Sequence, residues 1–194
     1  MPSQHTRRTA AALMATGVSA IAAPASAASA PLLPPTPVGA PQDFEFEHGN
    51  WDTSLRRRLR PLSGSDVWAE YVGTTLVHPL LSGRANLVEL DVSGPEGRIQ
   101  GLSLRLFEVQ QQRWTLNFSN AASGTLAAPM VGGFGGSPRG LFYSAEGFNG
   151  RPILVRFIIE SLSVDRCRFE QAFSADGGVT WEINWIAVDT RRSY

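Results

Sequence analysis

The stretch RCRFEQAFSADGGVTWEINWIAV, residues 166–188, contains two runs of alternating side chains with a glycine-rich segment between them. Every second residue of such a run falls on the same face of an extended strand. The separating residues Asp176, Gly177 and Gly178 have the composition of a tight turn, because glycine adopts positive φ without steric cost. This stretch therefore predicts a β-hairpin.

The same alternation extends along the chain from Trp51 and is interrupted at short intervals by Gly, Pro, Asp or Asn. Such spacing is typical of an antiparallel all-β domain. A meander of this length removes its exposed edges most simply by closing on itself, so we expect an up-and-down barrel of about eight to ten strands. The alternative is a two-sheet β-sandwich, but the even hairpin spacing and the lack of a Cys-Trp-Cys arrangement favour the barrel. The expected strands cover residues 51–60, 66–75, 84–93, 98–109, 112–119, 139–146, 151–160, 164–174 and 179–190.

The first thirty residues have the composition of a signal peptide, with Arg7 and Arg8 before an apolar segment of small residues and two A-x-A sites. Cleavage after Ala27 or after Ala30 fits equally well. The arginine pair permits the twin-arginine route, and ordinary secretion is the other interpretation. We expect a periplasmic or secreted protein, with a proline-rich linker over residues 31–42 and a barrel domain over residues 43–194.

The charge balance argues against several classes of partner. Removal of residues 1–30 takes away Arg7 and Arg8 and no acid, so the formal net charge falls from zero to −2. We therefore expect no nucleic-acid partner. We also expect no membrane span after signal cleavage, because no segment is long and apolar enough to be one. Cys167 is the only cysteine, and its place in a strand pattern favours a buried structural thiol.

Residues Ser174 to Trp181 satisfy the pattern S-x-D-x-G-x-T-W. This pattern resembles the Asp box of sialidase-type β-propellers, where it recurs once per blade at a hairpin tip. One copy in this domain is too few for a propeller, which needs at least about four blades. We interpret it as turn chemistry, in which Asp176 accepts N–H groups of the loop, and a carbohydrate-interacting protein remains a weaker alternative.

The segment DFEFEHGNW, residues 43–51, resembles the first-strand signature of lipocalins and the wider calycin group. The resemblance implies that Trp51 closes one end of the barrel and that Arg191 or Arg192 stacks over it. The whole of residues 43–192 resembles a family of exported bacterial proteins with a lipocalin-like barrel and no firmly assigned activity. The segments that carry this resemblance are DFEFEHGNW, SGTLAAPMVGGF, LVRFIIE and RFEQAFSADGGVTWEINW.

Several expected strands are apolar on one side and mix charged with large apolar groups on the other, as a ligand cavity with a few polar groups would require. This mixture makes five residues candidates for the cavity wall: Arg105, Asn117, Arg156, Glu170 and Asn184. Their arginines offer paired hydrogen bonds to a ligand carboxylate. The alternative is that these residues face outward on a half-exposed sheet, because periodicity does not separate inward from outward.

The leading hypothesis is a barrel that binds a small, mostly apolar molecule with a polar or carboxylate end and needs no cofactor. The alternative is a cofactor-free isomerase, cyclase or lyase with Glu170 as base and Arg105 or Arg156 stabilising an oxyanion. The sequence does not decide whether the protein is an enzyme. His48 and His78 have no metal-ligand spacing, so we expect no metal site. In a nitrobindin-like barrel, His48 or His78 would be a candidate haem ligand. The simpler interpretation is that both histidines lie in solvated loops.

Overall fold

The computed structural model describes residues 32–193, so the expected signal peptide at residues 1–30 lies outside the described residues. The described chain forms ten antiparallel strands that close into a single barrel. The strands are β1 (Gly49–Arg58), β2 (Trp68–Leu80), β3 (Ala85–Gly94), β4 (Gly97–Glu108), β5 (Arg113–Asn120), β6 (Met130–Gly133), β7 (Arg139–Phe148), β8 (Arg151–Ser163), β9 (Arg166–Ser174) and β10 (Glu182–Arg191). Two short 3-10 helices, η1 (Glu45–Glu47) and η2 (Leu81–Gly83), complete the described elements.

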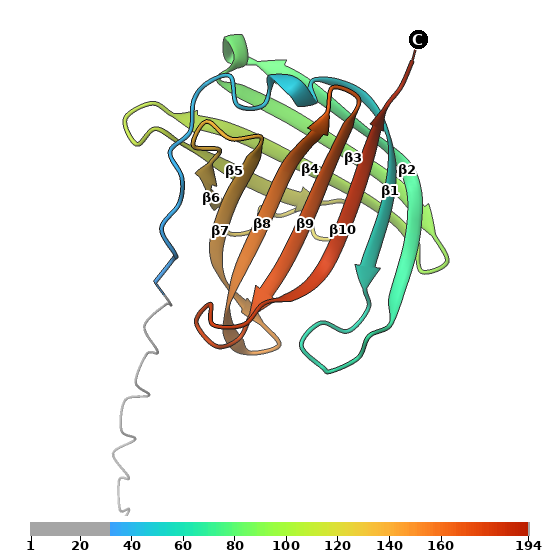
Figure 1. Cartoon of the computed structure of the whole chain (residues 1–194). Coiled ribbons are helices and arrows are strands. Elements are labelled where there is room, and N and C mark those ends of the chain that lie inside the picture. Colours follow the sequence, from blue (N-terminus) through green and yellow to red (C-terminus); the bar gives the residue numbers. More distant parts are fainter. Residues whose placement is uncertain (1–31, 194) are drawn as a thin grey trace, which may run out of the picture.

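Each strand pairs with its neighbours in sequence, and β10 returns to pair with β1 (Figure 1). The register of that closing pair places Trp51 opposite Arg191 and Thr53 opposite Asp189. The ring of strands therefore has no free edge, which removes the hazard of pairing with other chains. The barrel expected from the alternation is confirmed, and the sandwich alternative is wrong.

The strand that the sequence did not predict is β6, which lies in a glycine-rich segment between the strands expected at residues 112–119 and 139–146. β6 pairs with β5 and β7 over three residues on each side. At Gly132 an added Cβ would lie 1.9 Å from the carbonyl oxygen of Leu141, so only glycine fits between the neighbouring backbones. The glycine here permits close strand approach and does not mark a break.

Part of the proline-rich segment expected to be a linker is attached to the barrel. Gly39 donates its backbone N–H to the carbonyl of Gln112 (2.6 Å), and Val38 accepts the N–H of Gly135 (2.8 Å). The indole of Trp114 donates to the carbonyl of Ala40 (2.9 Å). The chain thus reaches η1 already fixed against the barrel wall, near the end of the barrel where β1 begins (Figure 1).

A cluster of buried aromatic rings lies at this same end. Phe44, immediately before η1, is 1% exposed and contacts the rings of Trp114, Phe134 and Phe142 at centroid distances of 4.7, 5.2 and 6.1 Å. Edge-to-face pairs of this kind add to the stabilisation from buried apolar area. We call this group, with Trp51, the aromatic plug; it closes one end of the barrel and leaves the interior toward the other end less filled.

Candidate functional site

The closed end is tied together by Arg191. Its guanidinium lies 4.1 Å from the ring centroid of Trp51 and donates to the carbonyls of His48 (2.8 Å) and Phe46 (2.7 Å). Of the two arginines expected over Trp51, Arg191 makes the contact, whereas Arg192 hydrogen-bonds Asp52 on the outer surface (2.6 Å). The first and last strands and η1 are therefore held together by one side chain.

A buried ion pair lies on the inner side of the plug. Arg105 Nη2 donates to Glu47 Oε1 at 3.0 Å and Nη1 donates to the second carboxylate oxygen. The two side chains are 4% and 1% exposed, and the guanidinium lies 4.5 Å from the ring centroid of Phe44. Because Glu47 takes both terminal guanidinium nitrogens, the charge of Arg105 is neutralised and is not available for a ligand carboxylate, although Arg105 Nε has no hydrogen-bond partner within the described chain.

Beyond this pair the barrel encloses a cavity of about 1030 Å³. That volume suits a drug-sized molecule, because ligand pockets commonly measure about 300–1,000 Å³. Its walls are mainly aromatic and aliphatic, and the large apolar residues along them include Val88, Leu116, Phe157, Phe169, Phe173 and Trp185. Arg105 and Asn184, two of the expected wall residues, also line it.

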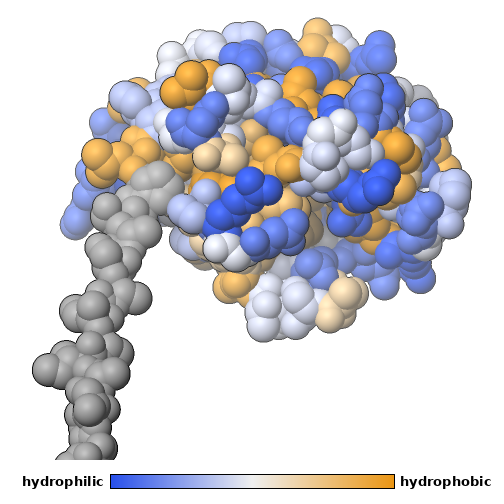
Figure 2. Space-filling view, turned by 90° about the horizontal axis from the view of Figure 1, so that it is seen from below, coloured by the Kyte–Doolittle hydropathy of each residue, from blue (hydrophilic) through white to orange (hydrophobic). Residues whose placement is uncertain are grey.

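The cavity opens at the end opposite the plug. Its lining there comes from the loops and strand ends around Arg60, Gln100, Ala121 and Asn149. Figure 2 views the molecule from below, the side on which these loops lie in Figure 1, and shows hydrophilic residues interspersed with hydrophobic ones around this end. A ligand would therefore enter between polar loops and pass into an apolar interior.

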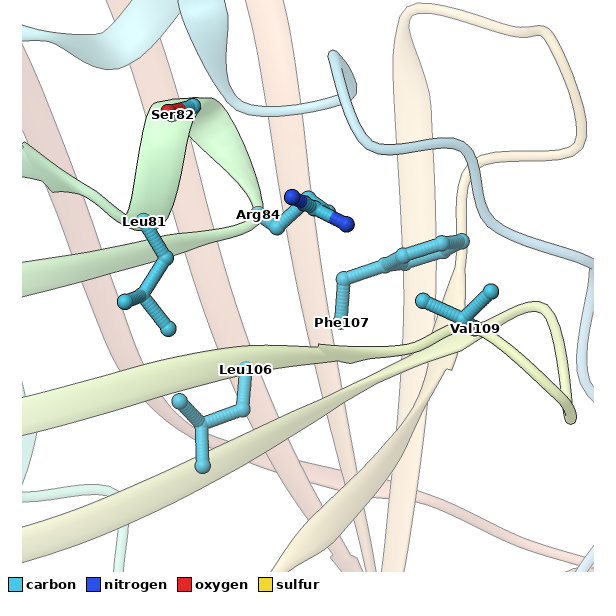
Figure 3. Close-up of a pocket in the computed structure, with 6 residues that line it drawn as sticks. All are labelled: Leu81, Ser82, Arg84, Leu106, Phe107 and Val109. Carbon is cyan, nitrogen blue, oxygen red and sulfur yellow. The ribbon is translucent and has the colours of Figure 1, made fainter.

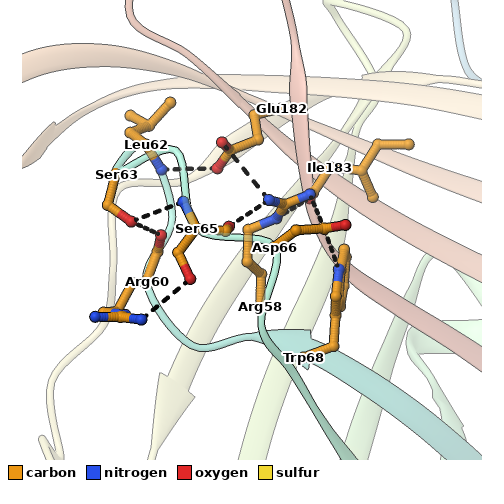
Figure 4. A network of polar contacts seen from close by, with 9 residues as sticks. All are labelled: Arg58, Arg60, Leu62, Ser63, Ser65, Asp66, Trp68, Glu182 and Ile183. Atoms are coloured by element: carbon orange, nitrogen blue, oxygen red, sulfur yellow. Dashed lines mark hydrogen bonds and ion pairs between the residues drawn. The ribbon is translucent and has the colours of Figure 1, made fainter.

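The β1–β2 loop at this mouth is held by a polar network (Figure 4). Arg58 donates to the carbonyls of Ile183 (3.1 Å) and Ser65 (2.6 Å), and Glu182 accepts the backbone N–H of Leu62 (2.7 Å). Leu62 has a φ of 58°, a left-handed conformation that non-glycine residues rarely adopt, and this network fixes it. The mouth is therefore preformed on this side.

Three arginines besides Arg58 line the mouth, and they differ in pairing. Arg98 forms a two-point pair with Asp91, and Arg60 donates to the hydroxyl of Ser65 at 3.3 Å. Arg57 has no hydrogen-bond or ion-pair partner among residues 32–193. Its position follows from the alternation of β1, where Trp51, Thr53, Leu55 and Arg57 share the inward face. Arg57 is thus an uncommitted positive charge at the entrance.

The inner part of the cavity wall holds an unusual acid. Asp189 is 2% exposed and lines the cavity beside Thr53 and Thr75, which hydrogen-bond each other at 2.7 Å. Burial raises the pKa of Asp189 to about 7, and the negative charge of Glu47 adds to this, while the neighbouring hydroxyls of Thr53 and Thr75 and the charge of Arg105 oppose it. A carboxyl group that titrates near neutrality is a recurrent feature of functional sites.

Three of the expected wall residues lie on the outer face of the barrel. In the β8–β9 register Phe157 pairs with Gln171, and both line the cavity. Arg156 and Glu170 each sit one position away and therefore project outward, where they form an ion pair at 3.7 Å. Asn117 donates to the carbonyl of Leu104 at 3.0 Å and does not line the cavity.

The outer face of β8 and β9 carries large apolar groups because other side chains cover it. Trp181, from the β9–β10 loop, lies 4.7 Å from the Arg156 guanidinium and 5.9 Å from the ring of Tyr143. Leu154 and Ile158 on the same face are 1% and 2% exposed. A mixed charged and apolar pattern here indicates a covered outer surface, which the sequence alone did not reveal.

Asn184 reaches the cavity through an irregularity. The β9–β10 register shifts between Ile183 and Trp185, so Asn184 sits in a bulge. The bulge interrupts the strict alternation of faces, and both Asn184 and Trp185 line the cavity. Gln171 donates to Asn184 Oδ1 at 2.9 Å, and the Asn184 amide nitrogen has no hydrogen-bond partner within the described chain. The sequence did not predict four residues of the cavity wall: Gln171, Asp189, Thr53 and Thr75. The one sequence feature that could have indicated them is Asp189, an acid that shares a strand face with Ala187 and Trp185.

The hairpin tip with the Asp-box-like pattern is occupied by its own hydrogen bonds. Asp176 accepts from the backbone N–H of Thr180 (3.0 Å) and from its hydroxyl, and Ser174 accepts the N–H of Gly178 (2.8 Å). The two bonds from Thr180, with a third from the hydroxyl of Ser174, lower the pKa of Asp176 to about 2. Gly177 and Gly178 have φ values of 75° and 94°. These contacts build a turn and offer no free group to a sugar.

Other possible sites carry less chemistry. No cluster of three or more His, Cys, Asp or Glu within residues 32–193 could hold a metal ion, and neither His48 nor His78 lines the cavity. No helix among the described residues has the length and hydropathy to cross a membrane. A second hollow of about 440 Å³ beside η2 is lined by Leu81, Ser82, Arg84, Leu106, Phe107 and Val109 (Figure 3). Arg84 is its only charged residue, so it lacks the convergent polar groups of the barrel interior.

Comparison with known proteins supports the architecture. No protein-family model matches the sequence, and no curated protein matches it. The S-type phycobiliprotein lyase CPES from Guillardia theta is similar in structure, with a TM-score of 0.51, 9% sequence identity and coverage of 78% of this chain and 91% of that chain. The chain thus has a calycin-like barrel fold.

Two designed barrels are also similar in outline. EF1p2_mFAP2b bound to DFHBI has a TM-score of 0.44 with 9% identity, and a de novo designed fluorescence-activating β-barrel has a TM-score of 0.43 with 10% identity. Each covers 78% of this chain and 98% of its own. These similarities are to the path of the chain alone, and the chemistry of the present cavity rests on its own residues.

Proposed function

We propose that the protein binds a small, elongated and mostly apolar molecule inside the barrel. The observation that supports this most directly is the cavity of about 1030 Å³ between the aromatic plug and the mouth. Large apolar side chains such as Phe157, Phe169 and Trp185 line it together with polar ones such as Gln171 and Asp189, and small-molecule sites combine apolar walls with placed polar groups in this way. The barrel needs no rearrangement to offer this space, because the β1–β2 loop is already fixed by Arg58.

The polar or carboxylate end of the ligand would remain at the mouth. Arg105, expected to bind it, is neutralised by Glu47, and Arg156 lies outside the barrel. Arg57 lines the entrance without a partner in the described chain, and its guanidinium can form a two-point contact with a carboxylate or sulfonate. The interior has few uncompensated charges, so an anion would be poorly solvated deeper inside.

Export is a further part of the proposal and rests on residues 1–30 alone. A ligand-binding barrel of this kind would act in the periplasm or outside the cell.

A second candidate function is that of a cofactor-free isomerase, cyclase or lyase in the same cavity. Glu170 does not fit the role of base, because it lies outside the cavity and pairs with Arg168 at 2.6 Å. The observation that favours an enzyme is Asp189, whose raised pKa of about 7 suits proton transfer near neutrality. Replacement of Asp189 by Asn would then abolish turnover of a bound compound and leave its binding intact.

The binding proposal is tested with phenylnaphthylamine, a neutral dye whose fluorescence rises in apolar surroundings. We expect the protein to bind it with one-to-one stoichiometry. Ser103→Trp places a large ring in the cavity from β4 and should weaken binding at least about tenfold, equivalent to about 1.4 kcal/mol. The matched control is Ser54→Trp on the exposed outer face of β1, which should bind the dye like the unchanged protein. Equal binding by both variants would place the dye outside the barrel and contradict the proposal.

The role of the mouth is tested with anilinonaphthalene sulfonate, which is the same dye with an added anionic group. Arg57→Gln should weaken binding of the sulfonate about tenfold and leave binding of the neutral dye unchanged. Arg56→Gln removes the same charge from the adjacent residue, which faces outward and pairs with Glu70 at 3.8 Å, and it should have little effect on either dye. Native mass spectrometry of the protein from its own source would then identify a co-purifying ligand.

A further inference from the structure

A polar group near the inner end of the cavity is made by three adjacent strands. Asp189 of β10 stands opposite Thr53 of β1 in the closing pair, and Thr53 hydrogen-bonds Thr75 of β2 at 2.7 Å. All three side chains are buried, at 2%, 3% and 5% exposed, and all three line the cavity. The group is thus built into the rigid part of the barrel and faces its interior.

One acceptor in this group is unused. Asp189 Oδ1 is fully buried and has no hydrogen-bond partner among residues 32–193. A buried polar atom without a partner costs about 1–3 kcal/mol, and its presence in a native protein calls for an explanation such as a catalytic role or a bound water, ion or other molecule. Because Asp189 lines the cavity, the missing partner can come from a molecule inside it.

We propose that Asp189 Oδ1 accepts a hydrogen bond from a neutral hydroxyl or N–H group at the inner end of the ligand, which therefore enters the barrel with its donor end first. This inference rests on the small-molecule binding proposed above and specifies the chemistry of the buried end. Together with Arg57 at the mouth, the inference describes a ligand with a neutral donor at its inner end, an apolar body and a polar or carboxylate group at its outer end.

A donor is favoured over an acceptor because of what a carboxyl group can do. An ionised carboxylate only accepts hydrogen bonds, and a protonated one still accepts through its carbonyl oxygen. A ligand donor therefore finds a partner in either protonation state, whereas a ligand acceptor needs the protonated form. Burial raises the pKa of Asp189 to about 7, so both states are accessible near neutrality.

The surroundings of Asp189 disfavour a charged ligand end. A ligand anion would face the carboxylate of Glu47 as well as Asp189, and a ligand cation would face the guanidinium of Arg105. The Glu47–Arg105 pair is internally neutral, so a ligand anion would lose its hydration without a partner of opposite sign, and a ligand cation would find such a partner only when Asp189 is ionised. A neutral donor avoids both penalties.

The experiment compares two isomers that differ in the donor. Decanol and methyl nonyl ether contain the same atoms, but only decanol has an O–H group. Each is titrated against phenylnaphthylamine bound to the full protein, and displacement is read from the loss of dye fluorescence. We expect decanol to displace the dye at a concentration about tenfold lower than the ether, the difference expected for one lost hydrogen bond to a buried acceptor.

Variants then locate the effect. Asp189→Leu removes the acceptor and should make the two isomers equal, while Asp189→Asn keeps an oxygen in the same position and should keep the preference for decanol. Asp52→Leu is the matched control, since Asp52 faces outward and pairs with Arg192, and it should leave the preference unchanged. A preference for decanol that persists in Asp189→Leu would overturn the assignment to Asp189.

Failure of the inference is distinguishable from failure of the proposed function. If the dye does not bind the unchanged protein, small-molecule binding itself is contradicted. If the dye binds and both isomers displace it equally, the cavity binds molecules but Asp189 does not recognise a donor. If decylammonium displaces the dye better than decanol, the inner end accepts a cation and the neutral donor is wrong.

Discussion

Replacement of Arg105 by Met should destabilise the protein more than any single change at its surface. Arg105 and Glu47 are 4% and 1% exposed and share two hydrogen bonds, and the guanidinium also lies over Phe44. Without Arg105 the carboxylate of Glu47 is left buried with no counter-charge. Breaking a buried pair in this way typically costs about 3–5 kcal/mol, so we expect a loss of that size in the free energy of unfolding.

The assay is urea unfolding followed by tryptophan fluorescence, with Glu47→Gln and the double variant measured beside Arg105→Met. Because both single changes break one interaction, the double variant should lose clearly less than the sum of the two. The matched control is Arg113→Met, which removes an arginine from a half-exposed pair with Glu108 and should cost less than about 1 kcal/mol. Additive losses, or an Arg105→Met effect as small as that of Arg113→Met, would refute the role of the buried pair.

Three further predictions concern groups with other roles. The pKa of the Asp189 carboxyl rises from 3.8 in the unfolded chain to about 7 in the fold, so its contribution to stability is complete below about pH 4 and is lost as the pH rises to about 7. Over this range the free energy of unfolding should fall by at most about 1.4 kcal/mol per pH unit. Urea titrations at several pH values should show a smaller fall for Asp189→Asn. Burial raises the pKa of the Cys167 thiol to about 12, so a thiol reagent should modify it only after denaturation; rapid labelling of the folded protein would contradict this. Gly132→Ala should lower the melting temperature by several degrees because its Cβ would meet the carbonyl of Leu141, whereas Gly147→Ala, with open space around it, should change it little.

Much of the barrel could be predicted from alternation and turn chemistry, because both are local properties of the sequence. The hairpin around Asp176 is an example, since its glycines and its Thr180 contacts lie within a few residues. β6 could not be predicted in the same way. Its glycines are required by backbones that lie next to it only after folding, and a glycine-rich segment gives the same local signal whether it is a strand or a loop.

The candidate site was predicted less well, for a reason specific to β8 and β9. Periodicity separates the two faces of a strand but assigns the inward one only when the other face is polar. Here the outer face is also covered, in part by Trp181 over Arg156, and Leu154 and Ile158 on it are as buried as Ile153 and Val155. The charged residues on that face form ion pairs outside the barrel. The cavity wall is instead the opposite, mainly apolar face of these strands, which includes Phe157 and Phe169.

The aromatic plug at one end of the barrel contributes mainly to stability, and the hollow interior toward the other end provides the space for binding. Large rings and the Glu47–Arg105 pair are concentrated in the aromatic plug, where fully buried residues such as Trp51 and Trp114 remove apolar surface from water. A hollow interior loses contacts that a filled core would make, and this loss lowers the stability of the wall that surrounds it. The plug offsets this loss at one end, so the middle of the barrel can remain open. Substitutions in the plug should therefore change unfolding more than dye binding, and substitutions along the cavity wall should do the reverse.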